Sequence, residues 1–396
     1  MEPGGGGEQS RRSALAADAL NAGALNYAPG GLLRSGHLQT VLGSVWPVAW
    51  LTRRRAARLR AAAQELLLDC GDDVRLQAFW SSAAGTSSAA GTSSAAGTSS
   101  AAGTSSAAGT SSPVGAGGRG GVRAVEAARV RRVAVLLHGW EGSAEATYVL
   151  SLGSLLLAHG FDVVRLNLRD HGQTHHLNRE IFHSCRLSEV VGAMRALAGH
   201  FARARLYLGG FSLGGNFMLR VAADARAPAA IAGVVAVSPV LDPEVTLAAL
   251  ERGPAIYQRS FLTRWSRSLR IKEGAWPGVH DFAQTLRLKA LRSMTADLVA
   301  RHTDFPSLQA YLEGYAVTGD RLAGLRVPAS VLLAEDDPIV PAADLTRLAP
   351  SPQLTVVRSR YGGHCGFGDG VARPSAADRF VLAQFEGFEL TAARAG

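Results

Sequence analysis

The fold is decided by residues 206–219, which read LYLGGFSLGGNFML. The apolar run 204–208 has the length of a buried strand, and the apolar spacing from Leu213 onward predicts a helix. Between them, residues 210–214 form the pattern G-x-S-x-G around Ser212. A serine in a sharp turn between a strand and a helix is typical of a nucleophile elbow, which lifts its hydroxyl above the edge of a sheet. The stretch therefore predicts a reactive serine at the rim of a sheet.

The pentapeptide alone does not identify a nucleophile. In a chain this rich in glycine and serine, roughly 0.4 chance matches to the pattern are expected. The alternative interpretation is a glycine-rich helix start with Ser212 as the capping residue. A base, an acid and an oxyanion hole at the same rim of the sheet would favour the nucleophile over the capping serine.

Two later loops supply the base and the acid in the chain order that this architecture requires. Residues 361–367, YGGHCGF, follow a predicted strand and place His364 as the general base. Residues 334–341, AEDDPIVP, leave another strand and carry the acid. We expect Asp337, whose neighbour Pro338 favours a turn toward the histidine loop, with Asp336 or Glu335 as alternatives. The acid would hold the imidazole tautomer and stabilise the imidazolium.

Two backbone N–H groups are expected to form the oxyanion hole. Leu213 follows the serine, so its N–H is one donor by position. The second is expected from Trp140, in the loop 138–143 that reads HGWEGS after a predicted strand. We expect His138 to have a structural role. Cys365, beside the base, is expected to be a small packing residue.

Strand and helix patterns alternate along most of the chain, which predicts an α/β-hydrolase fold: a mostly parallel eight-stranded sheet with helices on both faces. A hairpin around Asp72 would add an antiparallel edge. The predicted strands are 66–70, 74–80, 132–137, 161–166, 204–208, 231–237, 331–334 and 354–357. The predicted helices include 53–67 running into the first strand, 144–158, 187–201 and 376–388.

The domain organisation follows from where this alternation breaks. Residues 1–30 are predicted to be a disordered tail, and 31–240 and 326–396 the two parts of the core. Within the first part, 81–121 is expected to be a flexible insertion, because it holds five copies of AAGTSS, in which alanine is the largest apolar residue available to bury. Residues 241–325 are helical and rich in arginine and aromatic residues, and are predicted to be a lid. The alternative is a helical elaboration that does not contact substrate.

Composition excludes several other classes of protein. The formal net charge is +9, but lysine occurs only at Lys272 and Lys289 and the arginines are scattered, so no nucleic-acid partner is expected. Three cysteines at no metal-ligand spacing predict neither a disulfide framework nor a zinc site. The histidine cluster 170–176 is expected to brace the pocket, and no metal or cofactor is expected. Without a signal peptide or an apolar membrane span, the chain is expected to be cytoplasmic.

Taken together, these motifs resemble the α/β-hydrolases, and within them the YheT-like esterase/hydrolase family. The resemblance rests on residues 37–40 (HLQT), 138–143, 210–216, 336–338 and 363–367, and covers about residues 30–390. It implies a catalytic triad on Ser212, Asp337 and His364. It also implies carboxylic-ester hydrolysis, with acylglycerol or phospholipid substrates in some relatives. The repeat and the loop 167–172, NLRDHG, depart from the family pattern.

The sequence thus predicts a serine esterase, lipase-like in its apolar lid, that acts on short- or medium-chain or lipid-like esters through an acyl-enzyme. The Arg-rich lid is a candidate for peripheral membrane contact. The alternatives are a thioesterase, an amidase or an acyltransferase with the same triad, and a non-catalytic hydrolase-fold binding module. No oligomeric state is specified by the sequence.

Overall fold

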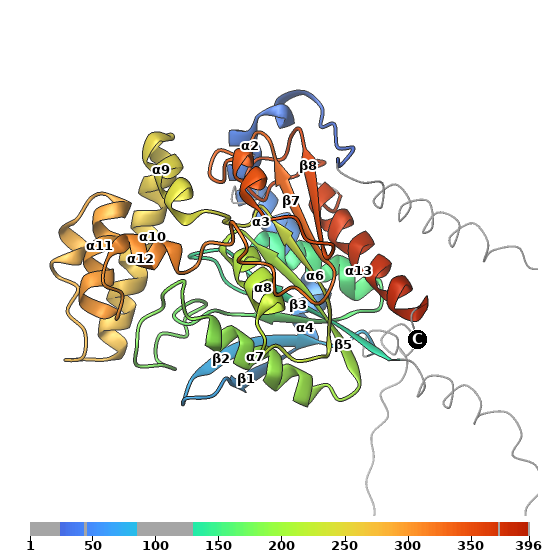
Figure 1. Cartoon of the computed structure of the whole chain (residues 1–396), viewed down its shortest axis with the longest axis horizontal. Helices are drawn as coiled ribbons and strands as arrows, with labels where there is room; N and C mark the ends of the chain where they lie inside the picture. Colours follow the sequence, from blue (N-terminus) through green and yellow to red (C-terminus); the bar gives the residue numbers. More distant parts are fainter. Residues whose placement is uncertain (1–23, 43–45, 85–129, 371–372, 395–396) are drawn as a thin grey trace, which may run out of the picture.

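The computed structural model describes residues 24–42, 46–84, 130–370 and 373–394, and its centre is one mixed sheet. Eight strands lie in the order β1-β2-β4-β3-β5-β6-β7-β8 (Figure 1). β1 pairs antiparallel with β2, β2 antiparallel with β4, and the remaining pairs are parallel. The predicted mostly parallel α/β fold is therefore confirmed. The strands are Ala63–Asp69, Arg75–Ser81, Arg131–Leu137, Asp162–Leu166, Ala204–Phe211, Ile231–Val237, Ala329–Ala334 and Leu354–Ser359, for β1 to β8.

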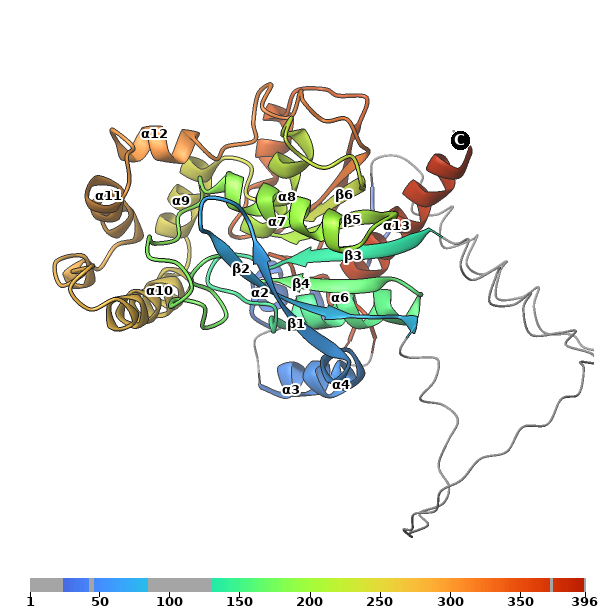
Figure 2. The ribbon, with the colours of Figure 1, turned by 90° about the horizontal axis from the view of Figure 1, so that it is seen from below.

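Helices cover both faces of this sheet. α6 (Thr147–Ala158) and α13 (Ala376–Arg394) pack on one face, through side chains such as Leu152 and Phe385. α7 (Leu187–His200) and α8 (Leu213–Ala223) pack on the other (Figure 2). This double cover explains why β3 to β7 read as nearly continuous apolar runs, since both faces of those strands are buried. Among the described helices, none combines the length and the apolar character needed to cross a bilayer.

The N-terminal elements differ from the prediction in their bounds. η1 (Gly31–Arg34), α2 (Gly36–Leu42), α3 (Trp46–Arg55) and α4 (Ala57–Ala61) precede the sheet. The predicted helix 53–67 ends at Ala61, because the next residues pair with β2 along its whole length, from Ala63 opposite Ser81 to Asp69 opposite Arg75. Cross-strand pairing thus overrides the helical pattern in this segment.

The predicted tail 1–30 is wrong for its last residues. The Leu25 N–H donates to the Arg358 carbonyl at 2.8 Å, next to β8, and the Tyr27 side chain is buried. One aromatic ring and the backbone pairing hold this segment on the core. The rest of the tail, and most of the predicted insertion 81–121, fall on 1–23 and 85–129, outside the described residues.

A helical segment runs between β6 and β7 and gathers beyond one end of the sheet (Figure 1). Its two ends meet, because the Val317 N–H donates to the Leu241 carbonyl at 2.9 Å. Several of its side chains join the core on the α7–α8 face, among them Leu247 and Tyr311. Part of the segment therefore shares the core of the sheet domain, while Leu269, Phe282, Met294 and Leu298 belong to a separate hydrophobic cluster. Its helices are α9 (Pro243–Arg252), α10 (Ala255–Ala275), η4 (Thr285–Arg287), α11 (Leu291–His302) and α12 (Leu308–Glu313).

A buried ion pair anchors α10 to the loop after β4. The Lys272 ammonium donates to Asp170 Oδ1 at 2.9 Å and to the carbonyls of His175, Asn178 and Glu180. The Lys272 and Asp170 side chains are 1% and 7% exposed, so neither has water as an alternative partner. Burial lowers the pKa of Lys272 and raises that of Asp170, while each partner opposes the shift in the other.

Replacing Lys272 with methionine is expected to lower the free energy of unfolding by about 3–5 kcal/mol, because it leaves a buried carboxylate without its cation. Chemical denaturation measures the change. Lys289 lies exposed on the same helical segment, so Lys289→Met is the matched control and should change stability by less than about 0.5 kcal/mol. Equal effects of the two substitutions would contradict the anchoring role of Lys272.

Candidate active site

Ser212 lies at the sharp turn between β5 and α8, in a backbone conformation that residues other than glycine rarely adopt. Its φ is 53° and its ψ is −122°. A Cβ on Gly210 would lie 2.4 Å from the Gly214 carbonyl oxygen, and one on Gly214 would lie 2.4 Å from the His138 carbonyl oxygen. Both glycines of the G-x-S-x-G pattern are thus needed for the chain to turn here. Backbone strain of this kind costs about 1–3 kcal/mol and is concentrated at functional sites.

The structure brings Ser212, His364 and Asp337 into one hydrogen-bonded chain. The Ser212 hydroxyl lies 2.9 Å from His364 Nε2, and His364 Nδ1 lies 3.0 Å from Asp337 Oδ2. The other carboxylate oxygen of Asp337 accepts the backbone N–H groups of Ile339 and Val340 at 2.8 and 2.9 Å. These bonds fix the carboxylate, so it holds Nδ1 as the protonated nitrogen and leaves Nε2 free to accept the serine proton.

The alternative acid positions do not reach the imidazole. Asp336 Oδ1 instead accepts the Gly363 N–H at 2.8 Å, which ties the acid loop to the histidine loop. No hydrogen bond joins Glu335 to His364 in the described part of the chain. Of the three carboxylates that the sequence offered, Asp337 is the one in contact with the histidine.

Opposing effects act on the protonation of His364. Burial disfavours the imidazolium, but the negative charge of Asp337 and its hydrogen bond, together with the neighbouring Cys365 side chain, raise the pKa of His364 well above its usual value. The imidazolium that forms when the histidine accepts a proton is therefore stabilised within the site.

Within the described residues, two backbone N–H groups beside the serine have no hydrogen-bond partner. Leu213 is the first residue of α8, so its N–H has no acceptor within the helix. The loop of Trp140 runs against the serine, since a Cβ on Gly139 would lie 3.0 Å from Ser212 Cβ. Among the hydrogen bonds of the described residues, none uses the Trp140 N–H, although its neighbours on both sides donate. Both predicted oxyanion donors are thus next to Ser212 and available to a ligand.

Two buried histidines brace this loop. The Gly139 carbonyl lies 2.7 Å from His138 Nδ1, and the Leu168 N–H donates to His138 Nε2 at 3.2 Å. His171 Nε2 likewise accepts the Glu141 N–H at 3.1 Å, and its Nδ1 lies 2.7 Å from the Arg169 carbonyl. Each ring accepts at Nε2 and must donate at Nδ1, which requires neutral imidazoles. Burial lowers the pKa of His138 to about 3 and of His171 to about 4, so both stay neutral at pH 7.

His175 of the cluster and His183, which follows it in the sequence, contact different residues. His175 Nε2 lies 2.8 Å from the Ser268 hydroxyl of α10, and His183 lies against the rings of Phe305 and Tyr311. Within the described ranges, no three histidine, cysteine, aspartate or glutamate side chains are grouped as metal ligands. Cys365 lies at a φ of 60° and its N–H donates to the Ser238 hydroxyl at 3.2 Å.

Sequence reasoning assigned no role to residues that hold the histidine loop. The His364 N–H donates to the Thr40 hydroxyl at 2.9 Å, and the Gly368 N–H donates to the buried side chain of Gln39 at 2.8 Å. Both belong to the HLQT stretch on α2. The signal available in the sequence was that short stretch itself, but the contacts span more than 300 residues.

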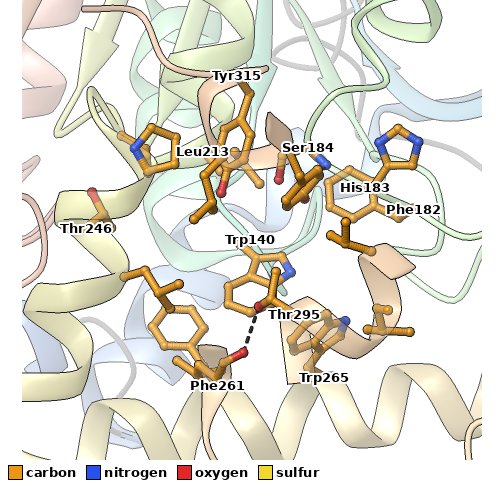
Figure 3. A pocket seen from close by; sticks show the side chains of 18 of the residues that line it. Trp140, Phe182, His183, Ser184, Leu213, Thr246, Phe261, Trp265, Thr295 and Tyr315 are labelled. Atoms are coloured by element: carbon orange, nitrogen blue, oxygen red, sulfur yellow. Dashed lines mark hydrogen bonds between the residues drawn. The ribbon is translucent and has the colours of Figure 1, made fainter. Parts of the chain in front are cut away.

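An apolar cavity of about 110 Å³ opens beside Ser212 and is roofed by the helical segment. Figure 3 shows the indole of Trp140 in its wall, near Phe261 and Trp265 of α10. The ring centroid of Trp140 lies 5.1 Å from that of Phe261, to which it is nearly parallel, and 4.9 Å from that of Trp265. The cavity is lined further by Leu247, Leu250, Leu291, Leu298, Val299, Leu312 and Tyr315.

Comparison with known proteins adds two relatives of this chain. Over 239 residues it is 26% identical to "Putative esterase YheT" of Escherichia coli K12, a match that covers 59% of this chain and 69% of that protein. Over 272 residues it is 22% identical to the embryogenesis-associated protein EMB8 of Picea glauca. That match covers 65% of this chain and 58% of EMB8, so a large part of EMB8 lies outside it. The predicted resemblance to YheT is confirmed as a distant homology.

Solved structures also resemble this chain, at low sequence identity. The Pyrococcus furiosus esterase Pf2001 aligns over 82% of this chain and 92% of its own length, with 12% identity and a TM-score of 0.47. The family described as alpha/beta hydrolase fold matches residues 133–371, which include the serine, the acid and the histidine loop. With the eight-stranded sheet, this match shows that the chain belongs to the α/β-hydrolase family.

Proposed function

We propose that this protein is a serine hydrolase that cleaves carboxylic esters through an acyl-enzyme. The observation that carries the proposal is the hydrogen-bonded chain from Ser212 to His364 to Asp337, with distances of 2.9 and 3.0 Å. Serine is a weak nucleophile unless an adjacent base takes its proton and a third group orients that base. The N–H groups of Leu213 and Trp140, which no other described residue accepts, add the donors that an oxyanion requires.

The reaction would proceed in two halves. Ser212 Oγ attacks the ester carbonyl carbon while its proton moves to His364 Nε2, and the carbonyl oxygen becomes an oxyanion held by Leu213 and Trp140 N–H groups. The intermediate collapses when the bond to the leaving alcohol breaks and Nε2 returns the proton to the alcohol oxygen. Water then attacks the acyl-enzyme with the same base, which releases the acid and restores the serine. Asp337 stays ionised throughout and stabilises the imidazolium in each half.

Labelling with a fluorophosphonate tests the proposal, because the reagent reacts with an activated serine and not with an ordinary hydroxyl. We expect one label per chain, located on Ser212 by peptide mass spectrometry, together with hydrolysis of p-nitrophenyl acetate. Absence of both from the folded protein would favour the non-catalytic binding module. Rates on an ester, a thioester and an amide with one acyl group would separate the esterase from a thioesterase or an amidase.

The pH dependence of kcat/KM is expected to show a rising limb whose midpoint lies above about 6.5, the ordinary histidine value. His364 acts as a base only when neutral, and Asp337 raises its pKa, so activity is lost as the pH falls through that raised value. Initial rates between pH 5 and 9 measure the limb. A midpoint at or below pH 6 would contradict the raised pKa of His364.

A further inference from the structure

Two cavities meet at Ser212, and they differ in size and in their access to the catalytic groups. The apolar cavity of about 110 Å³ is lined on one side by the helical segment. A second chamber of about 760 Å³ lies between α2, α3, α6 and the start of α10. Ser212, Trp140, Phe261 and Ile339 line both. The wall between the two spaces is therefore aromatic, built from Trp140 stacked on Phe261.

The position of the histidine decides which part of an ester enters which space. His364 lines the larger chamber, whereas Leu213, an oxyanion donor, lines the smaller cavity and not the chamber. The histidine must give its proton to the leaving oxygen, so the alcohol must lie on the His364 side of the tetrahedral intermediate. The acyl group then points away from the histidine, into the apolar cavity.

The size of the apolar cavity limits the acyl group. An apolar cavity of about 150 Å³ in another protein holds one benzene molecule, which has six carbons. A space of about 110 Å³ is of the same order, and so accommodates a chain of about six carbons at most. Two of its hydroxyls are satisfied by the backbone, since Thr295 donates to the Leu291 carbonyl and Thr303 to the Val299 carbonyl. Among the described residues, Thr246 Oγ1 and His183 Nδ1 in the same lining are buried without a hydrogen-bond partner.

We propose that the two cavities divide the substrate at Ser212, so that the substrate class is the ester of a short acyl group, of about six carbons or fewer, with a bulky alcohol. This inference rests on the proposed esterase function. α11 forms the far wall of the acyl cavity through Leu291, Thr295, Leu298 and Val299, which share one face of the helix. The alcohol chamber is lined by the hydroxyls of Thr40, Thr52, Ser151 and Ser154, each of which already donates within the protein and so faces the alcohol as a hydrogen-bond acceptor.

Two substrate series test the division. With p-nitrophenol as the constant leaving group, kcat/KM should fall at least tenfold between the hexanoyl and dodecanoyl esters. With a constant butyryl group, enlarging the alcohol from ethanol to a two-ring alcohol should change kcat/KM by less than threefold. A rate that rises up to the dodecanoyl ester, or that collapses with larger alcohols, would overturn the assignment.

Variants of α11 and α6 test which cavity binds the acyl group and which binds the alcohol. Thr295→Trp should lower the ratio of hexanoate to acetate turnover at least tenfold, and Leu298→Ala, which enlarges the cavity, should raise the ratio of octanoate to acetate turnover. Ser293→Trp, on the exposed face of α11, is the matched control and should leave both ratios unchanged. Ser154→Trp in the chamber should penalise large alcohols instead. If the α11 variants do not change the acyl-chain ratios, or if Ser154→Trp does not penalise large alcohols, the assignment of the two cavities is overturned. If the fluorophosphonate does not label Ser212 in the wild-type protein, the esterase function itself is overturned.

A different observation assigns a role to the stretch HLQT on α2. The Thr40 hydroxyl accepts the His364 N–H at 2.9 Å and donates to the Gly36 carbonyl at 2.7 Å. A Cβ on Gly36 would lie 2.0 Å from the Asp336 carbonyl oxygen, and one on Gly363 would lie 2.2 Å from the Gly36 carbonyl oxygen. The start of α2 is therefore packed between the acid loop and the histidine loop.

We infer that Thr40 is a positioning residue for the general base, because its hydroxyl fixes the backbone that carries the imidazole. Thr40→Val keeps the shape and removes the hydrogen bond, and should lower kcat about tenfold at constant KM. Thr40→Ser keeps the hydroxyl and should stay within about threefold of the wild type. Thr263→Val is the control, since Thr263 donates to its own helix carbonyl in the same way but is exposed.

Active-site titration separates positioning from a merely structural role. Each rate is divided by the fraction of chains that react with the fluorophosphonate, so that kcat refers only to folded, reactive protein. A kcat per titrated site that equals the wild type in Thr40→Val, or a serine variant as impaired as the valine variant, would overturn the assignment.

Discussion

Replacement of Ser212 by alanine is expected to lower kcat for ester hydrolysis by at least about 10⁵-fold, because members of a triad act as a unit. The side chain makes no hydrogen bond that caps α8, so its loss should leave the melting temperature nearly unchanged. Loss of turnover without loss of stability is what distinguishes a nucleophile from a structural serine. The rate of p-nitrophenyl butyrate hydrolysis measures kcat, and thermal unfolding of the same preparation measures the melting temperature.

Ser238 provides a matched control close to the site. Its buried hydroxyl accepts the Cys365 N–H at 3.2 Å and is not bonded to the imidazole. Ser238→Ala should therefore lower activity far less than Ser212→Ala does. If Ser212→Ala kept a tenth of the wild-type rate, the nucleophile would have to lie elsewhere.

Replacement of Asp337 by asparagine is expected to lower kcat by about 10⁴-fold while the fold is kept. An asparagine amide can present its NH₂ group to His364 Nδ1, which favours the tautomer that cannot accept the serine proton at Nε2. The same change removes the charge that raises the pKa of His364, so the rising limb of the pH profile should move to lower pH. Saturation kinetics at each pH give kcat for the first effect and the profile of kcat/KM for the second.

Asp336→Asn is the matched control for that experiment. Asp336 accepts the Gly363 N–H through one oxygen, an interaction that an asparagine carbonyl can also make. We expect at most about a tenfold loss of kcat and no shift of the acidic limb. If Asp336→Asn lowered kcat more than Asp337→Asn, the triad acid would have to be assigned to Asp336.

Much of the core followed from local patterns. β6 spans 231–237, as its apolar run predicts, and the elbow follows from two glycines that allow a tight turn around Ser212. The strand before it runs three residues further than the apolar pattern 204–208, to Phe211, because β3 and β6 pair with it up to the turn. Strands and helices can be predicted in this way because buried positions recur at the period of the strand or helix.

Other features could not be read from the sequence. The chain order Ser, acid, His indicated where the acid loop lies, but three consecutive carboxylates shared that loop. The hydrogen bonds of Asp337 to Ile339 and Val340 select which one faces the imidazole. The role of Thr40 was equally invisible, because its partner His364 is 324 residues away.

By itself, the sequence determined the strand-and-helix order, the turn at Ser212 and the candidate base, since these depend on local sterics and on hydrophobic periodicity. The tertiary structure decided which carboxylate contacts His364, how α2 holds the histidine loop, and how Trp140 and Phe261 separate two unequal cavities. Those features depend on distances between segments far apart in the chain. Such distances are set by how whole helices and strands pack, and no local pattern encodes them.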